Sequence, residues 1–247
     1  MTTVLLCDDS SLAHELLAGR VVAELGWDVR SVTDPERVGE AVDAAPPPDI
    51  AVVDLVFPSC WTGLDVLLAV HDASPATRLV IYTQGDAPVV ELLQAAWEAL
   101  PVAAALSKAM PADRVCHALR AVERGDPVPV DVVLRPFLPA SRSGLRTRAA
   151  YGRLVEHAGH AKLWRALIEL GDEASYDELA SHMGVLPVTV RHYRVGLRHE
   201  LALHGLTRPE MRHLQRFAKT CRPLLQSHID ARLPHGDGGA GDGTGPP

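Results

Sequence analysis

Five short strand-like segments, four of them apolar runs, alternate with helix-like stretches over the first 125 residues, and this alternation constrains the fold more than any other feature of the chain. The segments are too short for helices and are typical of buried strands. They cover residues 4–7, 29–32, 50–53, 79–82 and 102–106, and the stretches with helical periodicity cover residues 12–25, 35–44, 64–72, 87–99 and 111–124. This fivefold repeat predicts an α/β fold with a doubly wound, five-stranded parallel sheet and right-handed connections.

Polar side chains stand at or just beyond the ends of four of these segments. They are Asp8 and Asp9 after the first segment, Asp54 after the third, Thr83 after the fourth and Lys108 after the fifth. Because the carboxyl ends of parallel strands meet at one crevice, we expect these side chains to lie together. A single Asp at a strand end more often caps the following helix than serves as a metal ligand. Three carboxylates beside an ammonium and a hydroxyl, however, suit a divalent cation and a phosphoryl group.

The motifs that contain these residues resemble those of the response-regulator receiver domain in order and spacing. They read VLLCDDS, AVVDL, VIYTQ and LSK. The resemblance implies that Asp54 accepts a phosphoryl group from a partner histidine kinase and that Asp8, Asp9 and Asp54 hold Mg²⁺. It further implies that Lys108 pairs with the phosphoryl group and that Thr83 moves its hydroxyl onto the modified aspartate.

Three positions depart from the receiver pattern. Gln84 follows the switch threonine, where the family has a small residue, and Ala109 follows the lysine, where it has proline. Ala105 replaces the family's switch aromatic. The ligating residues are therefore intact while the transmitting residues are altered. This leaves open an atypical receiver that answers to a ligand or partner without phosphorylation.

Charge divides the chain into an acidic and a basic half. Residues 1–130 hold 19 Asp and Glu against 8 Lys and Arg, whereas residues 131–247 hold 12 against 16. The asymmetry indicates one module that handles a cation or signal and another that meets a polyanion.

The second half has helical patterns from residue 147 to about 225. Ser175 and Glu178 form a capping box, Gly184 makes a turn, and Pro187 suits the first position of the next helix. A short helix, a turn and a second helix with a basic outer face predict a helix-turn-helix. Residues 184–193 are similar to the LuxR/NarL-type recognition turn and helix, which implies binding to double-stranded DNA.

Five residues are candidates for contact with DNA phosphates or base edges. They are Thr189, Arg191, His192, Arg194 and Arg198. The net charge of this half is modest, so we expect specific binding to need a homodimer. A helix from Pro209 either covers the helical core or mediates dimerisation. Two alternatives remain open: a solvated basic face on a helical bundle, and an interaction adaptor that does not bind DNA.

The sequence predicts a receiver domain at 1–125, a linker at 126–146, a helix-turn-helix domain at 147–226 and a disordered tail at 227–247. It has no apolar run of about 18 residues, the length that spans a membrane, and four cysteines without CxxC spacing. We therefore expect a cytoplasmic protein with buried or half-buried free thiols. An enzyme such as a magnesium-dependent phosphatase is not expected, because no second acidic motif follows Asp54.

Overall fold

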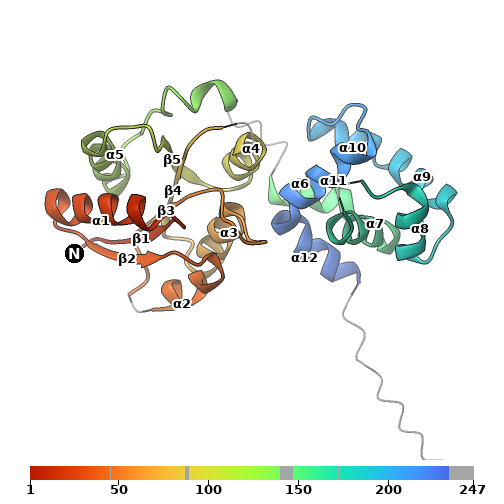
Figure 1. Ribbon diagram of the computed structural model, residues 1–247, viewed down its shortest axis with the longest axis horizontal. Coiled ribbons are helices and arrows are strands. Elements are labelled where there is room, and N and C mark those ends of the chain that lie inside the picture. The colour runs from red at the N-terminus through yellow and green to blue at the C-terminus, as the bar shows by residue number, and fades with distance from the viewer. Residues whose placement is uncertain (45, 87–88, 140–146, 172, 234–247) are drawn as a thin grey trace, which may run out of the picture. The chain divides into compact units, whose positions relative to one another are not determined.

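The computed structural model describes residues 1–44, 46–86, 89–139, 147–171 and 173–233. The chain divides into two compact units, Met1–Arg148 and Ala149–Pro247 (Figure 1). Most of the predicted tail, from residue 234 onward, lies outside the described residues, as do residues 140–146 of the predicted linker.

A five-stranded parallel sheet forms the centre of the first unit. Its strands lie in the order β2-β1-β3-β4-β5. They are β1 (Thr3–Cys7), β2 (Asp28–Val32), β3 (Ile50–Val53), β4 (Arg78–Thr83) and β5 (Val102–Ser107). This is the flavodoxin-like doubly wound order, in which the strand sequence reverses beside β1 and leaves a crevice at the carboxyl ends. The predicted fold class is confirmed.

Helices cover both faces of the sheet (Figure 1). They are α1 (Ser11–Leu25), α2 (Val38–Asp43), α3 (Gly63–Ala73), α4 (Val89–Ala99) and α5 (Ala112–Arg124). The helices α1 and α5 pack together on one face, where Leu6, Val52 and Leu119 belong to one buried cluster. The helices α2, α3 and α4 pack in series on the other. Because both faces are buried, the central strands are continuously apolar.

The chain after α5 remains part of the first unit and covers the free edge of β5. The Asp131 backbone N–H donates to the Ala105 carbonyl at 3.2 Å, and Leu134 is fully buried. Farther on, Gln94 Nε2 donates to the Phe137 carbonyl at 2.8 Å. We call residues 127–138 the strap. The linker predicted from residue 126 is wrong over this segment, because the buried Leu134 side chain and these hydrogen bonds fix it to the open sheet edge.

The second unit is helical. Its α-helices are α6 (Arg148–Gly152), α7 (Ala158–Glu169), α8 (Tyr176–Met183), α9 (Pro187–Gly196), α10 (Arg198–Leu203), α11 (Met211–Thr220) and α12 (Arg222–Arg232). Trp164 lies at the centre of its core and donates its indole N–H to the Leu154 carbonyl at 2.7 Å. The predicted boundary at residue 226 falls too early, because α12 continues to Arg232 and buries Ile229.

Two further expectations concern the membrane and the cysteines. Within the described parts of the chain, no helix combines the length and apolar character needed to cross a membrane. All four cysteines are free, as predicted. Cys60 is nevertheless exposed rather than buried, because it lies in the loop between β3 and α3.

The close approach of α3 to the end of β3 depends on Gly63. A Cβ atom at this position would lie 2.0 Å from the Asp54 carbonyl oxygen, which is backbone and cannot swing aside. Gly63→Ala is therefore expected to lower the free energy of unfolding by about 1–3 kcal/mol, as overpacking does, measured by urea denaturation. Gly19→Ala is the matched control, because nothing lies within 4 Å of its added Cβ. In a helix interior that change should stabilise the protein by about 0.5–1 kcal/mol; similar effects of both substitutions would contradict this packing argument.

Candidate functional site

The strand ends converge on an acidic pocket, and backbone hydrogen bonds that continue past the strands fix its residues. The Asp54 N–H donates to the Cys7 carbonyl at 2.9 Å, and the Lys108 N–H donates to the Thr83 carbonyl at 2.9 Å. Asp8 directly follows Cys7. The sheet thus places the ends of β1, β3, β4 and β5 at one crevice, as expected for this topology.

The ammonium group of Lys108 bridges two buried carboxylates. Its Nζ lies 2.7 Å from Asp54 Oδ2 and 2.8 Å from Asp8 Oδ2. Asp8 and Asp54 are 1% and 6% exposed, whereas Asp9 is exposed. Oxygens of these three carboxylates lie within 4.8 Å of one another. Three carboxylates around one ammonium leave an excess of negative charge, and hard oxygen donors at this spacing fit a divalent cation such as Mg²⁺.

Burial and charge shift the pKa values of the two central groups. Burial raises the pKa of Asp54 above its ordinary value and the charge of Asp8 adds to this, while the Lys108 hydrogen bond works in the opposite direction. Burial works to lower the pKa of Lys108, but its hydrogen bonds to Asp54 and Asp8 outweigh this and the pKa is raised. Lys108 therefore stays protonated, and Asp54 is a partly desolvated and more basic carboxylate.

Thr83 lies at the same edge with an unsatisfied hydroxyl. The residue is 1% exposed, and its Oγ1 has no hydrogen-bond partner among the described residues. A buried polar group without a partner destabilises the fold by about 1–3 kcal/mol. Such a group is suited to an acceptor that arrives from outside. The pocket opens through a cavity of about 400 Å³ that Thr83, exposed Gln84 and Lys108 help to line.

Leu134 of the strap lies beside this pocket, and the sequence did not identify it as a site residue. Gly85 has a positive φ of 82°, and a Cβ atom there would lie 2.7 Å from Leu134 Cδ2. The backbone two residues beyond Thr83 therefore rests against the buried Leu134 side chain. Ala105 is also covered by the strap, through the Asp131 hydrogen bond. The apolar residues of PVPVDVVL at 127–134 were a usable signal for this packing.

Comparison with known proteins gave matches among solved structures alone, since no family model and no curated protein matches the chain. A response regulator receiver domain protein from Clostridium thermocellum is 17% identical, with 50% of this chain and 95% of that chain covered and a TM-score of 0.44. A LuxR-family two-component response regulator from Aurantimonas sp. SI85-9A1 is 19% identical, with 55% and 94% covered and a TM-score of 0.46.

One match extends into the helical unit. It is a structure of two RcsB dimers bound to two parallel DNAs, which is 14% identical, with 79% of this chain and 89% of that chain covered and a TM-score of 0.49. The first two of these proteins are response regulators, the family that the sequence resembles. At such identities and TM-scores the matches add no argument about function, and the fold class rests on the strand order described above.

The helix pair α8 and α9 forms as the sequence predicts. Ser175 and Glu178 cap α8 reciprocally, with the Ser175 N–H donating to Glu178 Oε2 at 2.7 Å. Gly184 ends α8 with a φ of +66°, a conformation that favours glycine. Pro187 lies in the first turn of α9. Local sequence signals therefore fix both helix ends and the turn between them.

Tyr176 of α8 holds two of the candidate DNA-binding arginines. The guanidinium of Arg191 lies 5.0 Å from the centre of the Tyr176 ring, and Arg194 donates a hydrogen bond to the Tyr176 hydroxyl. Arg198 belongs to a different helix from Arg191 and Arg194, because α9 ends at Gly196 and Arg198 begins α10. Thr189 is half-buried, while Arg191 and His192 are exposed.

A histidine pair connects α7 to α9. His157 caps α7 by accepting hydrogen bonds at Nδ1 from the Gly159 and His160 N–H groups, at 3.1 and 3.3 Å. Its ring stacks on His160 at 3.8 Å, and the His160 ring meets Tyr193 of α9 edge-on at 5.8 Å. Burial, with a smaller effect of His157, lowers the pKa of His160 to about 4.

The raised pKa of Asp54 predicts a stabilising substitution. A carboxyl whose pKa is raised on folding favours the folded state at low pH, and this contribution is lost as pH rises through the folded-state value. At neutral pH without Mg²⁺, Asp54→Asn should increase the free energy of unfolding by about 1 kcal/mol, as relief of a strained functional site commonly does. Exposed Asp126 is the control, and Asp126→Asn should change stability by less than about 0.5 kcal/mol. A loss of about 3 kcal/mol on Asp54→Asn, typical of a broken buried ion pair, would contradict this.

The lowered pKa of His160 predicts acid sensitivity of the helical unit. The unfolded chain takes up a proton near pH 6.5, whereas the folded site does so only near its value of about 4. Stability should therefore fall as pH is lowered through this interval. Thermal unfolding of the full chain, followed by tryptophan fluorescence, should show a smaller pH dependence in His160→Leu than in the wild type. His192→Leu, at an exposed position, should retain the wild-type dependence; equal curves for all three proteins would refute the assignment.

Proposed function

We propose that this chain is a two-component response regulator that accepts a phosphoryl group on Asp54 from a histidine kinase and regulates transcription through DNA binding by its helical unit. One observation carries the proposal: the Lys108 ammonium spans Asp54 and Asp8, with the Asp9 carboxylate beside them. Each group has a place in phosphoryl transfer, which needs a nucleophile and positive charge for the transferred oxygens.

The reaction uses the chain's own carboxylate as the nucleophile. An Asp54 oxygen attacks the phosphorus of a phosphohistidine, forming an oxygen–phosphorus bond as the nitrogen–phosphorus bond breaks, and the imidazole leaves with the electron pair. Lys108 follows the phosphoryl oxygens as a mobile point charge. Mg²⁺, held by Asp8, Asp9 and Asp54, would supply charge that offsets repulsion between these carboxylates and the phosphoryl group.

The signal leaves the pocket through Thr83 and the strap. The unpartnered Thr83 hydroxyl has reason to move toward a phosphoryl oxygen, because this would satisfy its missing hydrogen bond. Such a movement shifts Gly85, which rests against Leu134. Ala105 has no ring to rotate, so the strap takes the place of an aromatic switch. The strap precedes the second unit in the chain, which gives the change a covalent route to the helical unit.

In the helical unit, α9 is the element that enters the major groove. Arg191 and His192 are exposed on it, and half-buried Thr189 lies in its first turn. Arg194 and Arg198 then contact phosphates at the edge of the groove. Three arginines give a single copy weak, salt-sensitive binding, so the active form is a homodimer on two half-sites.

A phosphorylation-independent receiver is the second candidate, and two observations favour it. Gln84 lines the mouth of the pocket. The Ala105 carbonyl accepts a hydrogen bond from the Asp131 N–H of the strap. In that case a ligand or partner would displace the strap without chemistry on Asp54.

Beryllofluoride with Mg²⁺ tests the proposal, because it mimics a phosphoryl group on a carboxylate. We expect it to increase the affinity for a selected DNA duplex by about tenfold, equivalent to about 1.4 kcal/mol, and to shift sedimentation toward a dimer. Asp54→Asn should abolish both effects. Leu134→Ala should bind beryllofluoride as tightly as the wild type but show a smaller gain in DNA affinity.

Three results separate the candidates. Unchanged spectra and sedimentation would reject phosphorylation-dependent switching. A beryllofluoride response with no duplex enriched from a random pool, even at low salt, would support an interaction adaptor instead. If Leu134→Ala shows the full gain in DNA affinity with beryllofluoride, the strap does not transmit the signal.

A further inference from the structure

The positive charge of the basic half is concentrated outside the helix-turn-helix. Residues 208–222 contain five Lys and Arg against one Glu, whereas residues 176–203, which span α8, α9 and α10, contain three of each sign. The helical elements predicted to read DNA are thus electrically neutral overall. The net charge that would attract a polyanion belongs to α11 and its flanks.

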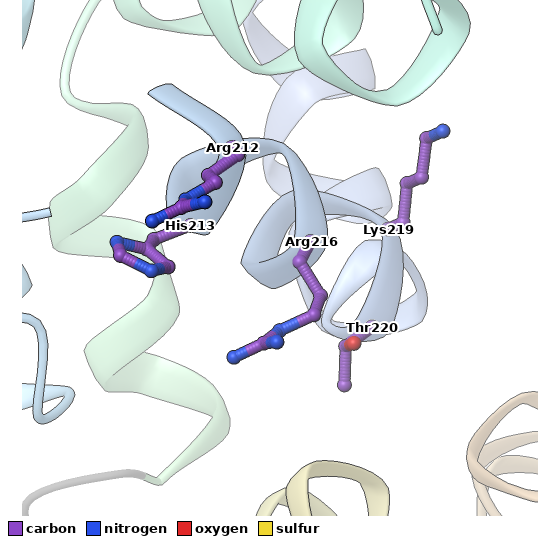
Figure 2. Close-up of a pocket in the computed structure, with 5 residues that line it drawn as sticks. All are labelled: Arg212, His213, Arg216, Lys219 and Thr220. Atoms are coloured by element: carbon purple, nitrogen blue, oxygen red, sulfur yellow. The ribbon is translucent and has the colours of Figure 1, made fainter. Parts of the chain in front are cut away.

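The outer face of α11 carries a basic hollow of about 430 Å³, lined by Arg212, His213, Arg216, Lys219 and Thr220. Figure 2 shows Arg212, His213 and Arg216 extending toward one side of the helix and Lys219 toward another. Every lining side chain offers a hydrogen-bond donor when His213 is protonated or in the suitable tautomer. Glu210 pairs with Arg212 at 2.9 Å, but both are mostly exposed. A surface pair of this kind is weak, so a stronger anion can replace it.

The inner face of α11 is already committed to its own unit. Leu214 and Ala218 are buried, and Phe217 packs against Trp164 at 5.8 Å between ring centres. Gln215 Nε2 donates to the Gly171 carbonyl at 3.1 Å. Of the two roles expected for this helix, its apolar face therefore serves the core. The remaining face is cationic, and two copies brought together through it would repel each other.

The candidate DNA-binding helix lies elsewhere and has its cations partly engaged. Arg191 and Arg194 of α9 both contact Tyr176. Within the second unit, Figure 1 shows α9 and α11 on opposite sides of α7. The helix α7 contacts both of them, so the hollow on α11 is separated from the face of α9 that would enter a groove.

We propose that the outer face of α11 binds phosphates of duplex DNA outside the stretch that α9 reads. The cations at positions 212, 216 and 219 are separated along the helix axis by about 6 and 4.5 Å, from a rise of 1.5 Å per residue. The Arg212 and Arg216 side chains extend to the same side of the helix, and cations this far apart can meet different phosphates of a strand, whose charges recur every 3.4 Å along the duplex axis. The inference rests on the proposed DNA binding and adds a second, sequence-independent contact to it.

The salt dependence of DNA affinity tests this contact. Each phosphate contact contributes about 0.9 to the slope of log K against log salt concentration. The affinity of the full chain for a duplex of about 30 base pairs is measured between about 50 and 200 mM salt. The triple variant Arg212→Gln/Arg216→Gln/Lys219→Gln should reduce the magnitude of the slope by about 2–3 without changing sequence preference. The charge-matched control is Arg20→Gln/Arg37→Gln/Arg124→Gln, at exposed positions of the first unit. It should leave the slope near the wild-type value.

The same measurements separate the α11 contact from DNA binding itself. If the wild type binds, Arg191→Gln weakens binding and the α11 variant keeps the wild-type slope, the α11 contact is refuted while DNA binding stands. If the wild type binds no duplex at low salt, DNA binding fails and the α11 contact fails with it. An altered sedimentation state of the α11 variant at an unchanged slope would assign the surface to protein contact and overturn the inference. Matching far-ultraviolet circular dichroism and melting curves ensure that a lower slope does not reflect misfolding.

Discussion

The bridge from the Lys108 ammonium to Asp54 and Asp8 is the interaction on which the site depends. Two buried carboxylates at the end of a sheet repel each other, and a third lies within reach of both. A single ammonium at 2.7 and 2.8 Å neutralises part of this charge. The remaining negative charge and the raised pKa of Asp54 keep the pocket receptive to a cation and to a group that removes charge from that carboxylate.

The surroundings of this bridge show how a local chemical change can reach the rest of the chain. Thr83 lies at the pocket with its hydroxyl unsatisfied among the described residues. Gly85 allows the backbone to turn at positive φ directly against Leu134. The strap contacts the Gly85 backbone through Leu134 and the Ala105 carbonyl through the Asp131 N–H, and it belongs to the segment that leads into the helical unit. Strap, pocket and sheet edge form one packed region rather than a domain and a separate linker.

Much of this arrangement could be predicted from the sequence, because it depends on local signals. The strand-like segments identified all five strands, and the capping box with Gly184 and Pro187 identified α8 and α9. The strap and the contacts of Tyr176 with two arginines could not be predicted in the same way. Both arise from contacts between residues distant in sequence, such as Asp131 with Ala105 and Tyr176 with Arg191. Proline-rich composition suggested a linker, whereas an open sheet edge gave that segment a place to pack.

We propose Asp54 as a phosphoryl acceptor that Lys108 and a bound divalent cation assist. Incubation with a small acyl phosphate donor and Mg²⁺, followed by intact-mass and peptide mass spectrometry, tests it most directly. We expect one phosphoryl group per chain, located on Asp54, dependent on Mg²⁺ and removed by hydroxylamine as an acyl phosphate should be. Absence of the adduct, or its persistence in Asp54→Asn, would contradict it.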